Sequence, residues 1–245
     1  MIGKTIIELD RVDSTNEYAA GLLQDEHPEE GLVIWAHEQV AGKGQNESRW
    51  ESEPGKNLTF SVILHPVFLA PDRQFMLNKS VSLGVLDFVT ALIPGATIKW
   101  PNDIYIGTRK VAGILIRNMV AGTIIESSVV GIGININQVR FAHEIPNPVS
   151  LTQILQREMT LKEALATVCG FLDCRYLQLK NGDHGKINQD YQQCLMGSGE
   201  WRMFKKNEEE FEGRIEGVDH FGRLLIVTRE GNRLSFDHKE IEYLF

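Results

Sequence analysis

The sequence predicts an α+β protein with two domains, a larger one over residues 1–196 and a small β-barrel of the SH3-like class over residues 197–245. Segments typical of strands and of helices are mixed up to about residue 195, whereas five short β-like runs separated by turns follow from Gly199. At 245 residues the chain is long enough for a full hydrophobic core.

The larger domain is expected to contain several strands and three longer helices. Apolar and β-branched runs predict strands at 5–9, 31–37, 58–64, 104–106, 111–116 and 123–136. Apolar residues at spacings of three and four predict a core helix over 71–92, and two further helices are expected at 160–179 and about 185–195.

A further helix is predicted from Ser14 to about Leu23. Ser14 and Glu17 have the S-x-x-E spacing of a capping box. The favoured interpretation is a structural cap. The alternative is that the free N–H groups of this helix start bind a polar ligand.

Composition argues against several classes of function. A net charge of −8 and a pI near 5.4 count against a broad nucleic-acid or membrane surface, because either would need a basic patch. We also expect no signal peptide, no segment of transmembrane length and a cytoplasmic location. The three cysteines lack metal-ligand spacing, so any protein ligands of a metal stay unknown.

The segment from Lys99 to Gly113 carries the strongest chemical signal. Gly107 and Thr108 suit a two-residue hairpin turn, with Lys110 at the start of the second strand. Strict alternation would put Ala112 and Ile114 on the face of Lys110, so its ammonium would stand on a mostly apolar wall and need an anion.

An exposed hairpin lysine is the alternative, and it holds for most lysines. The neighbouring sequence favours a site, because an aromatic ring, an amide and a carboxylate lie within a few positions: Trp100, Asn102 and Asp103.

Two glycine-containing segments complete the pattern. Gly42 and Gly44 lie in a polar stretch of twenty residues, and a loop of that length in a compact domain is commonly functional or disordered. Gly131 and Gly133 lie inside a predicted strand, where glycine often marks a close approach to the backbone.

Taken together, these motifs resemble the biotin protein ligase family over nearly the whole chain. The matching motifs, in family order, are D-S-T-N at 13–16, E-Q-x-A-G-x-G at 38–44, Trp50 with P-G-x-N-L at 54–58, K-W-P-N-D at 99–103, R-K-x-A-G-I-L at 109–115 and G-I-G-I-N at 131–135. The resemblance implies a mixed-sheet catalytic domain like that of class II synthetases and biotin ligases, followed by the family's small barrel.

The resemblance also implies a two-step reaction. Biotin and MgATP form biotinyl-5′-AMP, and the biotin then passes to one lysine of the biotin carboxyl carrier domain of a carboxylase. A lysine that touches both the biotin carboxylate and the α-phosphate would offset their repulsion, and Lys110 holds that position. Cofactors other than the substrates biotin and ATP are limited to Mg²⁺.

The resemblance assigns roles residue by residue. Lys110 is the catalytic residue. The residues implied in biotin binding are Ser14, Thr15, Asn16, Gln39, Lys43, Gly44, Gln45 and Gly113. Those implied in ATP or adenylate binding are Gly42, Trp50, Asn102, Asp103, Lys110 and Asn135.

The chain departs from the family in two respects. Many members carry G-R-G-R-x-G-R where this chain has Gly42 to Arg49 with Lys43, Gln45 and Glu47, so its loop carries fewer cations and is expected to retain the adenylate less well. There is no room for a DNA-binding domain before Ile6, so nucleic-acid binding is not expected. Whether the protein forms a homodimer is left open.

Two alternatives remain. Lipoate ligases and octanoyl transferases share the catalytic architecture but lack the K-W-P-N-D hairpin, and a non-catalytic biotin-binding relative would keep the fold without the reaction.

Overall fold

The computed structural model describes residues 1–44, 49–143 and 147–244. Its larger part is built on a seven-stranded sheet in the order β1-β2-β3-β7-β6-β5-β4. Strands β1 and β2 pair in parallel and the other neighbours pair antiparallel, so the sheet is mixed as expected. The strands are β1 (Ile6–Val12), β2 (Val33–Gln39), β3 (Leu58–Leu64), β4 (Ala96–Lys99), β5 (Asp103–Ile106), β6 (Arg109–Ala121) and β7 (Ile124–Ile134).

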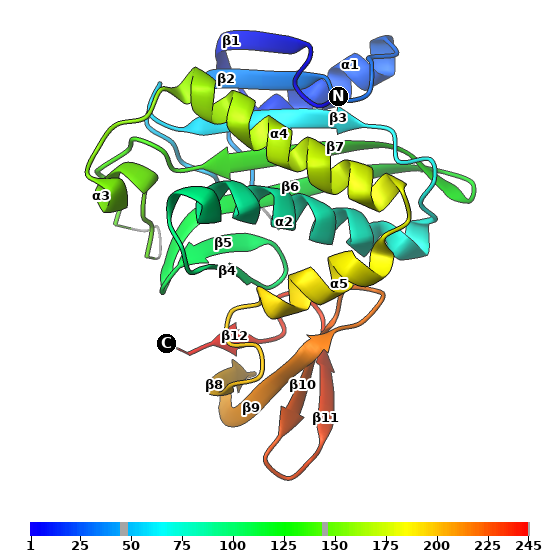
Figure 1. Ribbon diagram of the computed structural model, residues 1–245, viewed down its shortest axis with the longest axis vertical. Coiled ribbons are helices and arrows are strands. Elements are labelled where there is room, and N and C mark those ends of the chain that lie inside the picture. The colour runs from blue at the N-terminus through cyan, green and yellow to red at the C-terminus, as the bar shows by residue number, and fades with distance from the viewer. Residues whose placement is uncertain (45–48, 144–146, 245) are drawn as a thin grey trace.

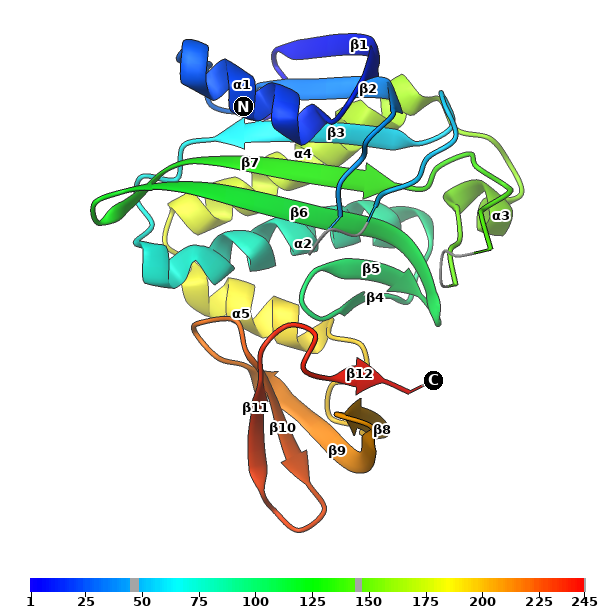
Figure 2. The same cartoon turned by 180° about the vertical axis from the view of Figure 1, so that it is seen from behind.

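Helices flank this sheet unequally. Figure 1 shows α2 and α4 across one face, and Figure 2 shows α1 on the other. The helices are α1 (Thr15–Asp25), α2 (Gln74–Leu92), α3 (Leu151–Leu155), α4 (Leu161–Lys180) and α5 (His184–Gln193), with a 3-10 turn, η1 (Pro71–Arg73), before α2. Helix α1 covers only part of the face opposite α2 and α4, so the rest of that face is available for a site.

The core lies between the sheet and α2 with α4. Buried side chains that meet there include Phe60, Ile132 and Ile134 from the strands and Val85 and Phe88 from α2. Contrary to the expectation from sequence, residues 71–92 form one helix long and apolar enough to cross a membrane by length and composition. Because 67% of its apolar window is buried in the protein, this is weak evidence for a membrane span.

The C-terminal segment forms the expected second sheet, antiparallel and in the order β11-β10-β9-β8-β12. Its strands are β8 (Trp201–Lys206), β9 (Glu209–Val218), β10 (Leu224–Thr228), β11 (Arg233–Phe236) and β12 (Glu242–Tyr243). One of the turns expected between these strands lies at Asn207 and Glu208, which both have positive φ and join β8 to β9. The proposed domain boundary at residues 196 and 197 falls between α5 and β8.

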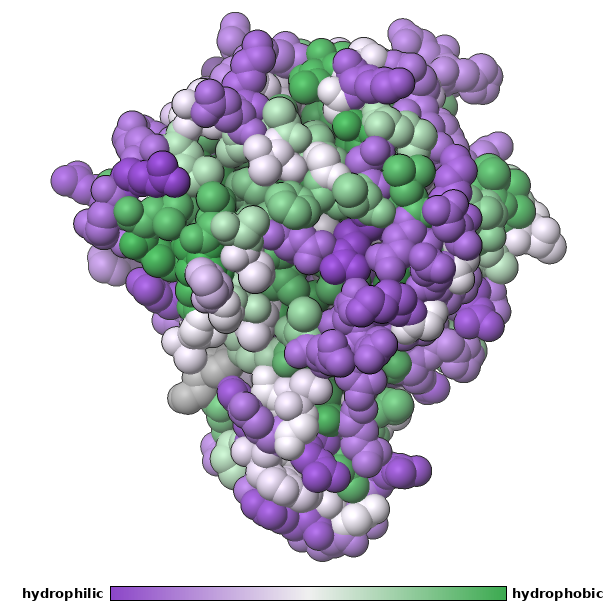
Figure 3. Space-filling view, viewed as in Figure 1, coloured by the Kyte–Doolittle hydropathy of each residue, from purple (hydrophilic) through white to green (hydrophobic). Residues whose placement is uncertain are grey.

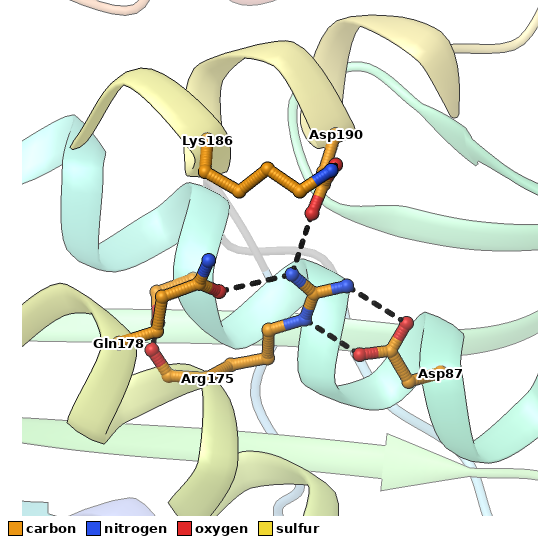
Figure 4. Close-up of polar contacts among 6 residues, drawn as sticks. Asp87, Arg175, Gln178, Lys186 and Asp190 are labelled. Carbon is orange, nitrogen blue, oxygen red and sulfur yellow. Dashed lines mark hydrogen bonds and ion pairs between the residues drawn. The ribbon is translucent and has the colours of Figure 1, made fainter. Parts of the chain in front are cut away.

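Helix α5 is held to α2 and α4 by a charge network. Figure 4 shows Arg175 of α4 with both carboxylate oxygens of Asp87 on α2, at 2.6 and 3.2 Å, and with Asp190 on α5, at 2.7 Å. Gln178 accepts a further hydrogen bond from the same guanidinium. Three helices are thereby fixed to one another by a single side chain.

The outer surface of this helical layer mixes polar and apolar residues (Figure 3). At one end of the sheet the tip of the β6–β7 hairpin extends beyond the helices (Figure 1) and carries the exposed residues Val120 and Ile124. The catalytic motifs predicted from sequence lie on the opposite side.

Candidate active site

A pocket of about 260 Å³ opens on the face of the sheet away from α2 and α4. Its floor comes from β3, β6 and β7, and its rim from the start of α1, the loop after β2 and the turn between β11 and β12. Predicted site residues that line it are Ser14, Thr15, Asn16, Gln39, Lys43, Gly44, Trp50, Asp103, Lys110 and Gly113.

One end of the pocket is a buried polar cradle. Gln39 Oε1 accepts hydrogen bonds from the backbone N–H of Thr15 at 2.7 Å and from its hydroxyl at 3.1 Å. Ser61 Oγ lies 2.7 Å from Thr15 Oγ1 and 2.6 Å from Asn16 Oδ1, and Asn16 Nδ2 donates to the carbonyl of Leu115. These groups are held in place by one another, so a ligand with fixed N–H and C=O groups would meet preorganised partners.

The predicted capping box does not form. Ser14 is the N-cap of α1 but its side chain makes no capping hydrogen bond. The N–H of Thr15, at the first position of the helix, donates to Gln39. Glu17 turns outward to two cations, with its Oε1 2.6 Å from Lys43 Nζ and 2.6 Å from Arg117 Nη1. These two cations lower the pKa of Glu17, mainly through their hydrogen bonds.

The pocket floor is made of glycine. Gly131 and Gly133 face the pocket, while Ile132 and Ile134 between and beyond them face the core. A Cβ on Gly131 would collide with the amide of Asn16, and a Cβ on Gly133 with the ring of Trp50. The G-I-G-I run therefore gives one strand a flat binding face and an apolar core face.

The expected partners of Lys110 on β6 were wrong. The register shifts between Ile104 and Tyr105, which pair with Ala112 and Lys110, so β6 has an extra residue at that point. Beyond this bulge Ala112 and Ile114 are buried in the core, and Gly113 follows Lys110 on the pocket side. The predicted turn at Gly107 is correct, with φ of +59°.

Lys110 lies at the other end of the pocket from the cradle. Its Nζ is 2.7 Å from Asp103 Oδ2, and both side chains are only partly exposed. The Nζ also lies 5.8 Å from the ring centroid of Trp50. The ammonium contacts one carboxylate and one aromatic ring, so it can still approach an anionic ligand.

Trp50 covers the glycine floor. Its backbone N–H donates to the carbonyl of Gly42, which closes the base of the loop, and Lys43 pairs with Arg49 in an isolated bridge. The indole Nε1 is buried and has no hydrogen-bond partner in the described part of the chain. An unsatisfied buried donor at the floor of a pocket points to a ligand acceptor.

Three predicted residues do not line the pocket. Asn102 is buried and donates to the carbonyl of Ile114, and Asn135 is buried and donates to the carbonyl of Val149. Both fix the backbone on either side of Lys110. Gly42 lies behind Trp50. Gln45 falls outside the described residues.

The sequence predictions missed several pocket residues. Ser61, which does not line the pocket but contacts the pocket residues Thr15 and Asn16 from behind, was also missed. It lies in a strand whose polar residues alternate with apolar ones, which was the signal for a second buried polar face. His238 and Lys239 come from the β11–β12 turn. His238 stands 5.9 Å from Trp100, and burial lowers the pKa of its imidazole. No local signal in the sequence relates this turn to the pocket.

Within residues 1–44, 49–143 and 147–244, no group of three or more His, Cys, Asp or Glu side chains could hold a metal ion. Asp103 is the carboxylate among the pocket residues.

Comparison with known proteins agrees with this geometry. The sequence matches the model of the Biotin/lipoate A/B protein ligase family over residues 8–135. The chain belongs to this family. Its curated relatives include the bifunctional ligase/repressor of Bacillus subtilis, 29% identical over 94% of this chain and 72% of that protein. The biotin–[acetyl-CoA-carboxylase] ligase of Paracoccus denitrificans is 27% identical over 92% of this chain and 95% of that protein.

A solved structure supports the same placement within the family. The biotin protein ligase of Aquifex aeolicus, in complex with biotin and ATP, superposes with a TM-score of 0.80 at 27% identity and covers 98% of both chains. The match includes the C-terminal sheet, so both parts of the expected fold are confirmed.

Proposed function

We propose that this chain is an ATP-dependent, AMP-forming biotin protein ligase. It activates biotin as biotinyl-5′-AMP and transfers the biotin to a lysine of a biotin carboxyl carrier domain. The observation that carries the proposal is a single pocket that joins a fixed polar cradle to Lys110 across a glycine floor. The relatives that match nearly the whole chain are named as biotin ligases, which favours biotin over lipoate as the substrate.

The cradle suits the ureido ring of biotin. Thr15, Asn16, Gln39 and Ser61 place hydroxyl and amide groups around one end of the pocket. Because the ring is rigid and its N–H and C=O groups must be satisfied when buried, these partners select against a flexible acyl chain that lacks them.

Lys110 then acts where the two anions meet. The biotin carboxylate attacks the α-phosphate, the bond to the β-phosphate oxygen breaks, and pyrophosphate leaves. The ammonium of Lys110 stabilises the negative charge on the transferring phosphoryl group, and Asp103 holds it at the pocket until ligands enter. Trp50 offers its ring and its free N–H to the nucleotide.

Mg²⁺ would enter with ATP and lower the charge of its phosphates, with Asp103 as the protein carboxylate at hand. In the second step a carrier lysine attacks the mixed anhydride and AMP leaves. The loop at Lys43 and Gly44 borders the pocket and would limit hydrolysis of the adenylate by water. We propose a cytoplasmic location for this reaction.

The decisive test is transfer of label to an apo-carrier domain. Label from biotin should appear on the carrier in the presence of MgATP, and ATP–pyrophosphate exchange should require biotin. Equal exchange with lipoate would overturn the choice of substrate. Biotin binding without exchange or transfer would identify a non-catalytic relative.

A further inference from the structure

A second cavity lies at the junction of the two sheets and shares no lining residue with the active-site pocket. It measures about 250 Å³ and opens between η1 with α2, helix α5 and the loop joining β9 to β10. In Figure 1 this loop lies beside one end of α5. The cavity has room for several waters or one small oxyanion with bridging waters.

A buried ammonium forms part of its wall. Lys79 of α2 is only 5% exposed. Its Nζ donates to Asn188 Oδ1 at 2.9 Å and lies 5.3 and 5.5 Å from the ring centroids of Phe75 and Tyr191. No carboxylate in the described part of the chain lies within ion-pair distance of this ammonium.

The charge of Lys79 is thus poorly compensated. An amide oxygen and two ring faces replace only part of the hydration that burial removes. Burial accordingly lowers the pKa of Lys79 to about 8, and the more distant Asp219 opposes this shift. A ligand that brought negative charge to the cavity would restore the lost interaction.

The rest of the cavity fits an anion. Arg73 and His220 line it from η1 and from the β9–β10 loop. Asp219, the carboxylate among its lining residues, is already occupied: Oδ1 accepts from the N–H groups of Phe221 and Arg223, and Oδ2 from Arg223 Nε at 2.8 Å. Side chains that can donate therefore line the cavity from three elements, and Arg223 partly offsets the charge of its carboxylate.

We propose that this cavity binds a tetrahedral oxyanion of the phosphate class, with Lys79 as its central contact and Arg73 and His220 as outer contacts. Donors that come from three different elements match oxygens that point in four directions better than the two oxygens of a carboxylate. The bound oxyanion would connect α2, α5 and the barrel loop, so it would stabilise the junction of the domains.

Thermal unfolding of the full chain tests the site, with inorganic phosphate compared against sodium chloride at equal ionic strength. Phosphate should raise Tm saturably, because it binds the folded state. Lys79→Met, which keeps volume among the rings, should weaken phosphate affinity roughly 10- to 100-fold, as expected for loss of a charged hydrogen bond. Lys162→Met on exposed α4 surface is the matched control and should respond like wild type.

Two further variants make the outcome decisive. Arg73 is exposed, so Arg73→Gln should fold normally and bind phosphate about threefold more weakly or worse. Lys110→Ala should keep the full phosphate response, because the phosphate site is separate from the active site. The phosphate proposal can therefore fail or hold independently of the proposed ligase activity. Glycerol 3-phosphate in place of phosphate distinguishes an esterified from a free source. A wild-type Tm that phosphate raises no more than chloride, or a full phosphate response in Lys79→Met or Arg73→Gln, would overturn the proposal.

Discussion

Lys110 and Arg175 are both partly buried cations paired with aspartate, yet their surroundings differ. Arg175 has two carboxylates and an amide arranged around its guanidinium (Figure 4). Lys110 has one carboxylate, at 2.7 Å, and stands at the edge of a pocket. The planar fork of arginine suits several fixed partners, whereas the flexible lysine can turn to a new one.

The difference teaches which charges hold the fold and which do chemistry. Where the protein supplies every partner, the cation stabilises the arrangement of helices. Where it supplies one and leaves an open side, the cation is available to a ligand. The following variants should separate these two roles in opposite directions.

The largest effect is expected from Lys110→Ala. Loss of the charge that stabilises the transferring phosphoryl group should lower the adenylation rate at least 100-fold, or about 3 kcal/mol of transition-state stabilisation. Tm should change little, because Asp103 is partly exposed and can be hydrated. Biotin-dependent ATP–pyrophosphate exchange measures the rate.

Lys110→Arg sharpens this test. A fork is a poor substitute for a point charge where two anions meet, so it should rescue only weakly. Near-normal exchange in Lys110→Ala would show that the pocket works without this ammonium.

Arg175→Met should do the reverse. It leaves the carboxylates of Asp87 and Asp190 without their main partner between packed helices, which should cost about 2–3 kcal/mol of stability. The exchange rate measured well below Tm should stay close to wild type. Chemical denaturation gives the free energy of unfolding, and an unchanged value would remove Arg175 from the structural role.

The two faces of β7 offer a finer version of the same comparison. Gly131→Ala places a methyl group against the buried amide of Asn16, so biotin affinity should fall roughly tenfold, and overpacking should also cost about 1–3 kcal/mol of stability. Ile134→Val, on the core face of the same strand and outside the pocket lining, should cost about 1 kcal/mol of stability and leave biotin affinity unchanged. Calorimetric titration with biotin measures the affinity of both. A biotin affinity unchanged in Gly131→Ala would mean that the cradle does not contact the ligand.

The structural network should also appear in the pH dependence of stability. Burial alone would raise the pKa of Asp190, but hydrogen bonds from Lys186 and Arg175 outweigh it and lower the pKa below the ordinary 3.8. The contribution of Asp190 to stability is therefore complete above the unfolded pKa and is lost as pH falls through the lower folded value. Between about pH 5 and pH 2, wild type should lose more stability than Asp190→Asn. Parallel curves for the two proteins would argue against this carboxylate as a source of the difference.

The sequence predicted those parts of the fold and site whose signals are local. The core helix α2, the turn at Gly107 and the five C-terminal strands each follow from spacing or turn residues that are close in sequence. The capping box failed because the Glu17 side chain, which would return to the N–H of Ser14, is held by Lys43 and by Arg117, which is distant in sequence. The face of β6 was wrong because a bulge next to Lys110 breaks the alternation. The pocket position of His238 depends on how two sheets pack, which no local pattern encodes.

The smallest effect concerns Glu17, which lies between these two kinds of charge. Its carboxylate holds both Lys43, at the pocket rim, and Arg117. These side chains are exposed, so Glu17→Gln should change stability by less than about 1 kcal/mol. It should, however, release Lys43 toward the adenylate phosphate and slow dissociation of biotinyl-5′-AMP by about two- to fivefold, since one surface ion pair no longer competes.

Arg117→Gln is the matched control, because it leaves the pair of Glu17 with Lys43 in place and should not slow dissociation. Dissociation of labelled adenylate from the two variants decides the matter. Equal rates would show that Lys43 does not exchange partners, and that Glu17 belongs with the saturated charges of the fold.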